Sequence, residues 1–125
     1  MRRLLLWGPP IVYMAAIFHL SSQSQPLPEV TEHVWDKLLH TIEYGGLAAL
    51  FARALIGEGV GYVYALLAAI VLTSTYGASD EYHQLFVPLR SADIQDWFAD
   101  TIGAAVGAVG AVAYALTVSR STNQR

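Results

Sequence analysis

Four long apolar segments constrain the fold of this chain more than any other feature. They cover about residues 4–20, 38–56, 60–78 and 97–118. As helices rising about 1.5 Å per residue, they would each be roughly 25–33 Å long, close to the thickness of the hydrocarbon core of a bilayer. A soluble helical bundle would need a polar stripe along each helix, and none runs through 63–73 or 102–118. The sequence therefore predicts an all-α polytopic membrane protein with four transmembrane helices in a single domain, residues 1–125.

Composition narrows the classes of function. The chain contains no cysteine, which excludes disulfides and thiol chemistry. It has no basic run or nucleic-acid-binding motif, so we expect no nucleic-acid partner. Arg2 and Arg3 precede the first apolar segment as in a signal peptide, but that segment ends at Ser21 and Ser22 without a small-residue cleavage site. We expect the segment to be retained as a helix.

The charged residues are divided between the two ends of the predicted helices. One end carries a single acid, Glu58, and five basic residues, which are Arg2, Arg3, Arg53, Arg120 and Arg125. The opposite end carries Lys37, Arg90 and the other nine acidic residues. Cytoplasmic ends of transmembrane helices are rich in Lys and Arg. The sequence therefore predicts that both termini lie in the cytoplasm and that the acidic end faces outward.

The second predicted helix begins with polar residues at helical spacing. Intervals of four and three place Asp36, His40 and Glu43 on one face, with Tyr44 at its edge. Glu43 lies two turns into an apolar segment, where an isolated charge costs about 2.5 kcal/mol or more. A buried acid of this kind is paired, protonated or functional. We therefore expect this face to line a polar site.

The third and fourth predicted helices bring further polar residues to the same end. Thr73, Tyr76, Asp80 and His83 share one face of the third helix, whereas Glu81 fits an exposed helix end equally well. The acids of the fourth helix form one stripe, which consists of Asp93, Asp96 and Asp100. We expect the three polar faces to converge on one outward-facing pocket that also receives Arg90 and Lys37.

A small-residue seam continues the acidic stripe of the fourth helix. Gly103 and Gly107 are four residues apart, and such spacing lets another helix approach closely. The seam turns the stripe toward a neighbouring helix, so we expect Asp100 to be buried beside a partner such as His40 or Arg90. The same two glycines would also permit a homodimer.

These polar motifs resemble those of the VanZ-like membrane protein family. The resemblance rests on Ser21-Ser22, Asp36-Lys37-x-x-His40-x-x-x-Tyr44, Asp80-Glu81-x-His83-Gln84-x-Phe86-x-Pro88-x-Arg90-Ser91, and Asp93-x-x-Asp96 leading to Gly103. Leu89 departs from the family pattern, in which a glycine usually precedes the arginine, and Asp100 stands where an asparagine is usual. The resemblance implies a four-helix, multi-pass protein of the bacterial plasma membrane. The name-giving member of the family is associated with low-level resistance to the glycopeptide antibiotic teicoplanin.

The sequence leaves several functions open. The first is binding of a cell-envelope component, such as a lipid-linked cell-wall intermediate, or of the lipid-bearing antibiotic, with membrane lipids around the helices. The candidate ligand-binding residues are Asp36, Lys37, Glu43, Tyr44, Glu81, Gln84, Arg90, Asp93, Asp96 and Asp100. A proton-coupled transport role and a scaffold role are further alternatives.

The second function is that of a small membrane enzyme, a hydrolase or transferase that acts on a lipid-linked substrate. His40 and His83 would act as general acid and base, and Asp36, Asp80 or Asp96 would tune them. No nucleophile motif accompanies them. In either function a divalent metal is an additional hypothesis, because Asp36 with His40 and Asp80 with His83 have chelating spacing on a helix.

Overall fold

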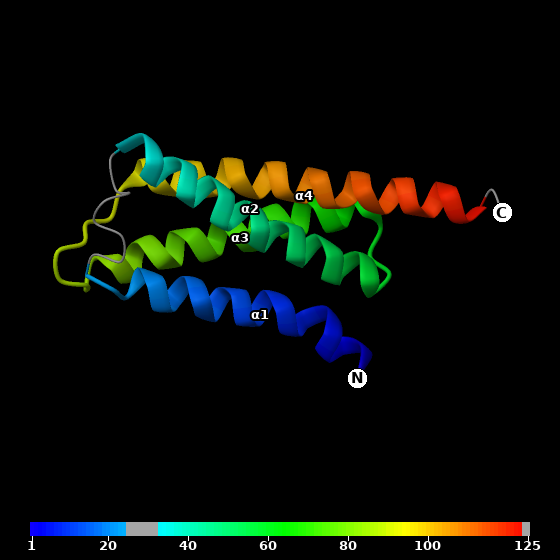
Figure 1. Cartoon of the computed structure of the whole chain (residues 1–125), viewed down its shortest axis with the longest axis horizontal. Coiled ribbons are helices and arrows are strands. Elements are labelled where there is room, and N and C mark those ends of the chain that lie inside the picture. Colours follow the sequence, from blue (N-terminus) through cyan, green and yellow to red (C-terminus); the bar gives the residue numbers. More distant parts are fainter. Residues whose placement is uncertain (25–32, 124–125) are drawn as a thin grey trace.

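A computed structural model of the protein describes residues 1–24 and 33–123. Within these residues the chain forms four helices and no strand. They are α1 (Arg2–Ser21), α2 (His33–Gly57), α3 (Tyr62–Gln84) and α4 (Ile94–Asn123). The four helices lie roughly side by side as one bundle (Figure 1). The predicted all-α architecture is confirmed. α1, α2 and α4 extend beyond their predicted apolar segments at both ends, whereas α3 begins slightly later than predicted and continues through polar residues to Gln84.

Three of the described helices, α1, α3 and α4, are long and apolar enough to cross a membrane. α2, which carries His40, Glu43 and Arg53, does not meet the same criterion. It contacts all three other helices, and Tyr44 and Leu47 on it have no exposed surface. This central position buries His40 and partly buries Glu43, whereas Arg53 is exposed near the other end of the helix. The first two polar residues are therefore shielded by the neighbouring helices, and α2 can be less apolar there than the helices around it.

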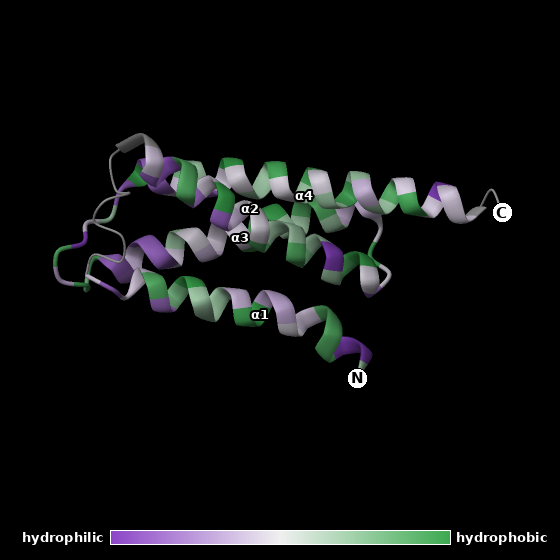
Figure 2. Ribbon diagram, in the orientation of Figure 1, coloured by the Kyte–Doolittle hydropathy of each residue, from purple (hydrophilic) through white to green (hydrophobic). Residues whose placement is uncertain are grey.

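The outer surface of the bundle is apolar along most of its length. Ile11 on α1, Val63 and Val71 on α3, and Val106 on α4 each expose well over half of their surface. Hydrophilic residues gather at the end of the bundle where α1 and α3 finish and α2 and α4 begin (Figure 2). We call this the polar end. A surface of exposed apolar side chains with one polar end is the pattern of a protein embedded in lipid.

The beginning of α1 and the end of α4 lie at the opposite end, which we call the terminal end (Figure 1). This placement is what an even number of crossings requires. Which end faces the cytoplasm remains a prediction from the charge distribution.

The closest helix contact joins α2 and α4 through glycines. A methyl group on Gly103 would overlap the backbone carbonyl of Thr41, and one on Gly107 would overlap that of Gly45. The backbones can approach this closely only because both positions lack a Cβ. The predicted seam is therefore used within the chain. A homodimer stays a prediction, and it would have to use a surface other than these two glycines.

Candidate functional site

The centre of the polar end is a buried pair between α2 and α4. Nδ1 of His40 lies 2.8 Å from Oδ1 of Asp100. Asp100 is completely buried and His40 nearly so. The His40 ring lies parallel to that of Tyr44, with centroids 6.2 Å apart. The expectation that Asp100 is buried beside His40 is confirmed, and the glycine seam explains it, because the seam draws the acidic stripe of α4 against α2.

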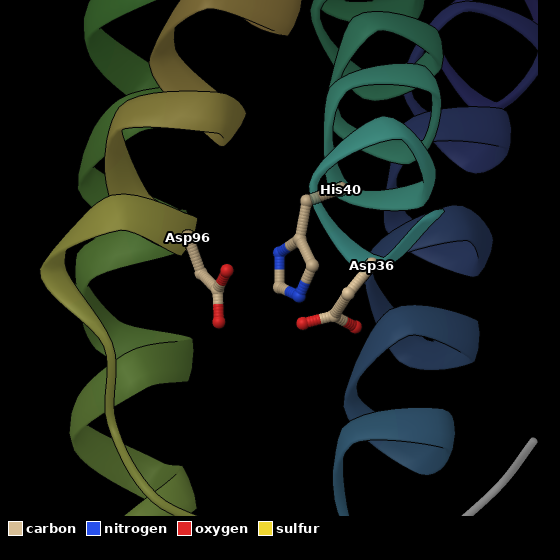
Figure 3. Close-up of side chains that lie close together, drawn as sticks. All are labelled: Asp36, His40 and Asp96. Atoms are coloured by element: carbon tan, nitrogen blue, oxygen red, sulfur yellow. The ribbon is translucent and has the colours of Figure 1, made fainter. Parts of the chain in front are cut away.

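Two further carboxylates flank His40 (Figure 3). Asp36 lies one turn before it on α2, and Asp96 comes from α4. Their side chains extend toward the imidazole from either side (Figure 3). One ligand atom from each of the three residues lies within 4.8 Å of the other two. The imidazole of His40 is thus surrounded by carboxylates on both sides.

Lys37 is the cation that enters this acidic group. Its Nζ lies 2.9 Å from Oδ2 of Asp93 and also pairs with Oδ1 of Asp96. Burial lowers the pKa of the Lys37 ammonium, but its bonds to Asp93 and Asp96 outweigh that effect and raise the pKa above its ordinary value. Lys37 therefore stays charged and ties the beginning of α2 to the beginning of α4.

The end of α3 supplies the third wall of the site. The Tyr44 hydroxyl donates to Oδ2 of Asp80 at 3.1 Å. Oε2 of Glu81 accepts the backbone N–H of Asp93 at 2.8 Å. Both carboxylates are buried, so Glu81 does not occupy an exposed helix end. Gly77, one turn before Glu81, leaves the space that Oδ2 of Asp100 occupies, because a Cβ there would lie 2.8 Å from this oxygen.

A pocket of about 290 Å³ opens between α1, α2 and α3 at the polar end. Its polar lining comes from Ser21, Asp36, His40, Glu43, Asp80, Gln84 and Arg90, with the Tyr13 ring beside them. Its apolar lining comes from Ile17, Leu20, Leu39 and Ile42. Leu20 and Ile42 are also exposed on the outside of the bundle, so the pocket continues into the lipid-facing surface. It thus combines a charged floor with an apolar rim.

Residues 8–116 match the family model described as VanZ/LLP1. This range contains the pocket and most of each helix. The chain belongs to the VanZ/LLP1 family. Comparisons with curated proteins and with solved structures find no match.

The loop between α3 and α4 turns sharply just before Arg90. Leu89 has a φ of 64°, in the left-handed region that favours glycine. The turn directs Arg90 toward α1, where its Nε donates to the carbonyl of Gln23 at 3.0 Å. A second guanidinium nitrogen donates to the carbonyl of Leu20 at 3.4 Å. Arg90 therefore caps the carboxyl end of α1, and no ion pair to an acid is formed by it among the described residues.

One predicted residue lies away from the others. Nε2 of His83 is 3.1 Å from Oγ of Ser22, and its ring packs on Phe18 with centroids 4.6 Å apart. His83 does not line the pocket, and neither do the predicted ligand-binding residues Lys37, Tyr44, Glu81, Asp93, Asp96 and Asp100. The pocket lies between α1, α2 and α3, whereas the predicted one lay between α2, α3 and α4. Sequence reasoning also missed the contribution of α1, from which Tyr13 and Ser21 face the site. Ser21 is part of the family motif, which is the signal that would have revealed it.

Proposed function

We propose that the polar end binds an amphiphilic component of the bacterial cell envelope. The pocket between α1, α2 and α3 carries this proposal, because one opening joins a charged floor to an apolar, lipid-facing rim. Such a surface matches a ligand with a polar head and an acyl or prenyl chain. A lipid-linked cell-wall intermediate and a lipid-bearing glycopeptide of the teicoplanin kind both have this construction.

The size of the pocket limits which part of such a ligand it can enclose. About 290 Å³ is at the lower limit of ligand pockets and holds a head group rather than a whole lipid. The chain of the ligand would lie outside, along the exposed side chains of Leu39 and Ile42. Arg90 and Gln84 would donate to the head, because most other polar groups in the lining are carboxylates. In the plasma membrane, this binding would contribute to envelope homeostasis or to resistance of the teicoplanin type.

Mass spectrometry of the detergent-solubilised protein tests the proposal. We expect a specific envelope lipid to co-purify with the wild-type chain, and we expect Arg90→Ala to retain much less of it. Arg53→Ala is the matched control, because Arg53 lies on α2 toward the terminal end and outside this pocket. Equal lipid retention by the wild type and Arg90→Ala, with both proteins folded by circular dichroism, would contradict it.

A second candidate function is favoured by the His40–Asp100 pair. A carboxylate on Nδ1 orients an imidazole and leaves Nε2 for another partner, which is how a general base is positioned. His40 also lines the pocket. The protein would then hydrolyse or transfer a group on its lipid-linked ligand. Incubation of the purified protein with undecaprenyl-linked substrates tests this, and no turnover across a range of pH and divalent metals would count against it.

A further inference from the structure

We propose that His40, Glu81 and Asp100 bind one divalent metal ion inside the polar end. One ligand atom from each of these residues lies within 4.8 Å of the other two, and all three residues are buried. They come from α2, α3 and α4, so the ion would join three helices. This proposal does not depend on lipid binding, since Glu81 and Asp100 do not line the pocket and metal binding is measured without a lipid.

Two buried carboxylate oxygens carry the proposal. Glu81 uses Oε2 to accept a backbone N–H, and Asp100 uses Oδ1 to pair with His40. Their other oxygens, Oε1 of Glu81 and Oδ2 of Asp100, are buried and have no hydrogen-bond partner among the described residues. A buried carboxylate oxygen without a donor is costly, and a metal ion is one of the few ligands that would satisfy two of them at once.

The balance of charge around His40 also favours a cation. Asp36, Asp96, Glu81 and Asp100 all belong to groups that converge on this histidine. Among the described residues, the ion pairs at the polar end use only Lys37 and His40 as cations. Lys37 is bound to Asp93 and Asp96, so it does not reach Glu81 or Asp100 in these pairs. The inner carboxylates therefore lack a permanent positive partner, and a divalent ion would provide one.

The second group of possible metal ligands, Asp36, His40 and Asp96, offers a route for the ion. Asp36 lines the pocket and is only partly buried, and Figure 3 shows it beside His40 with Asp96 on the opposite side. An ion that entered through the pocket would first meet Asp36 and would then pass His40 to reach Glu81 and Asp100. His40 belongs to both groups, which makes it the residue on which metal binding most depends.

The donor set indicates the class of metal. One imidazole and two carboxylates suit Zn²⁺ or Mn²⁺ better than Ca²⁺, because Ca²⁺ is bound by oxygen ligands alone. Ligands about 2.0–2.2 Å from a zinc ion lie roughly 3–4 Å from one another, so the three ligand atoms would have to move only slightly closer together to hold the ion. This set replaces Asp80 and His83 as metal ligands, because His83 contacts α1 and joins neither group.

Metal binding by the full-length protein, purified without an affinity tag and stripped with a chelator, tests the proposal. Equilibrium dialysis against Zn²⁺ and Mn²⁺ should give about one ion per chain for the wild type. His40→Gln and Glu81→Gln should each weaken binding at least about tenfold. His83→Gln and Glu58→Gln are matched controls for the histidine and the acid, because neither residue belongs to a group that could hold the ion, and they should bind as the wild type does.

A spectroscopic measurement keeps the test decisive if a variant fails to fold. Electron paramagnetic resonance of Mn²⁺ bound to the wild type should show hyperfine coupling to one imidazole nitrogen. The proposal is overturned if the wild type binds neither metal, if the bound Mn²⁺ shows no nitrogen coupling, or if folded His40→Gln and Glu81→Gln bind as tightly as the wild type. Equal losses in His83→Gln and His40→Gln would also overturn the assignment.

Discussion

The α2–α4 interface and the packing of α1 are built by opposite means. α2 and α4 meet backbone to backbone, and Gly45, Gly103 and Gly107 leave no room for a side chain between them. α1 buries only three residues, Pro10, Ile17 and Ser21. Side-chain hydrogen bonds hold it, such as that from Tyr76 to the carbonyl of Met14 at 2.7 Å.

This difference shows how the bundle combines a fixed site with an accessible one. In lipid, helix association depends on close packing and hydrogen bonds rather than on the hydrophobic effect. The tightly packed α2–α4 pair therefore fixes His40 and Asp100, while the loosely packed α1 forms the wall of a pocket that a ligand can enter. Substitutions in the two regions should therefore differ in their effect on stability.

Gly107→Ala should disrupt the tight interface. The new methyl group would overlap the backbone carbonyl of Gly45, which cannot move aside as a flexible side chain would. We expect the free energy of unfolding in mild detergent to fall by about 3 kcal/mol, the upper part of the usual range for overpacking. Gly110→Ala on the same helix is the control, because nothing lies within 4 Å of its Cβ position. Equal stability of the two variants would show that the seam is not tightly packed.

Tyr76→Phe should loosen α1 with a smaller effect. The substitution removes the hydrogen bond to the Met14 carbonyl, and such bonds between transmembrane helices contribute about 0.6–1.7 kcal/mol. Hydrogen exchange should rise in α1 and stay unchanged in α2 and α4. Tyr64→Phe serves as the control, because Tyr64 is exposed on α3. Faster hydrogen exchange in α4 as well would mean that the packing of α1 is coupled to the packing of α4.

Leu89→Gly should change the free energy of unfolding least, and it should raise it, whereas the other two substitutions lower it. A leucine at a φ of 64° is strained by about 1–2 kcal/mol, and glycine removes that strain while adding entropy to the unfolded chain. We expect a net gain of about 0.5–1 kcal/mol, measured by thermal unfolding. Leu85→Gly is the control and should not stabilise the protein, because Leu85 has a φ of −59°. A lower stability of Leu89→Gly than of the wild type would show that the backbone of Leu89 is not strained.

The sequence predicts the contact between α2 and α4 at the core of the site, but it does not predict which residues of α1 line the site. The spacing of Asp100 and Gly103 on one stripe, and of Asp36 and His40 on another, predicted which faces of α4 and α2 would meet. Helical periodicity gives the face of a residue but not the helix that covers it. His83 was therefore grouped with Asp80, although α1 covers His83 and α2 covers Asp80.

The end of α3 and the following loop were harder to predict for a related reason. Glu81 is buried because the backbone of Asp93 returns to donate to it, and that contact spans a loop without helical periodicity. The direction of Arg90 depends on the left-handed turn at Leu89, which a leucine does not signal. Loop geometry of this kind follows from tertiary contacts rather than from local sequence.

Photocrosslinking in native membranes tests most directly whether the pocket beside α1 binds an amphiphilic envelope component. A photoreactive amino acid replaces either Ile42, which lines the pocket, or Val71, which does not; their exposed fractions are 63% and 62%. We expect the probe at position 42 to crosslink one polar envelope lipid, and we expect Arg90→Ala to reduce the yield of this product. Val71 should crosslink only bulk membrane lipids. Identical lipid products at the two positions would contradict the account.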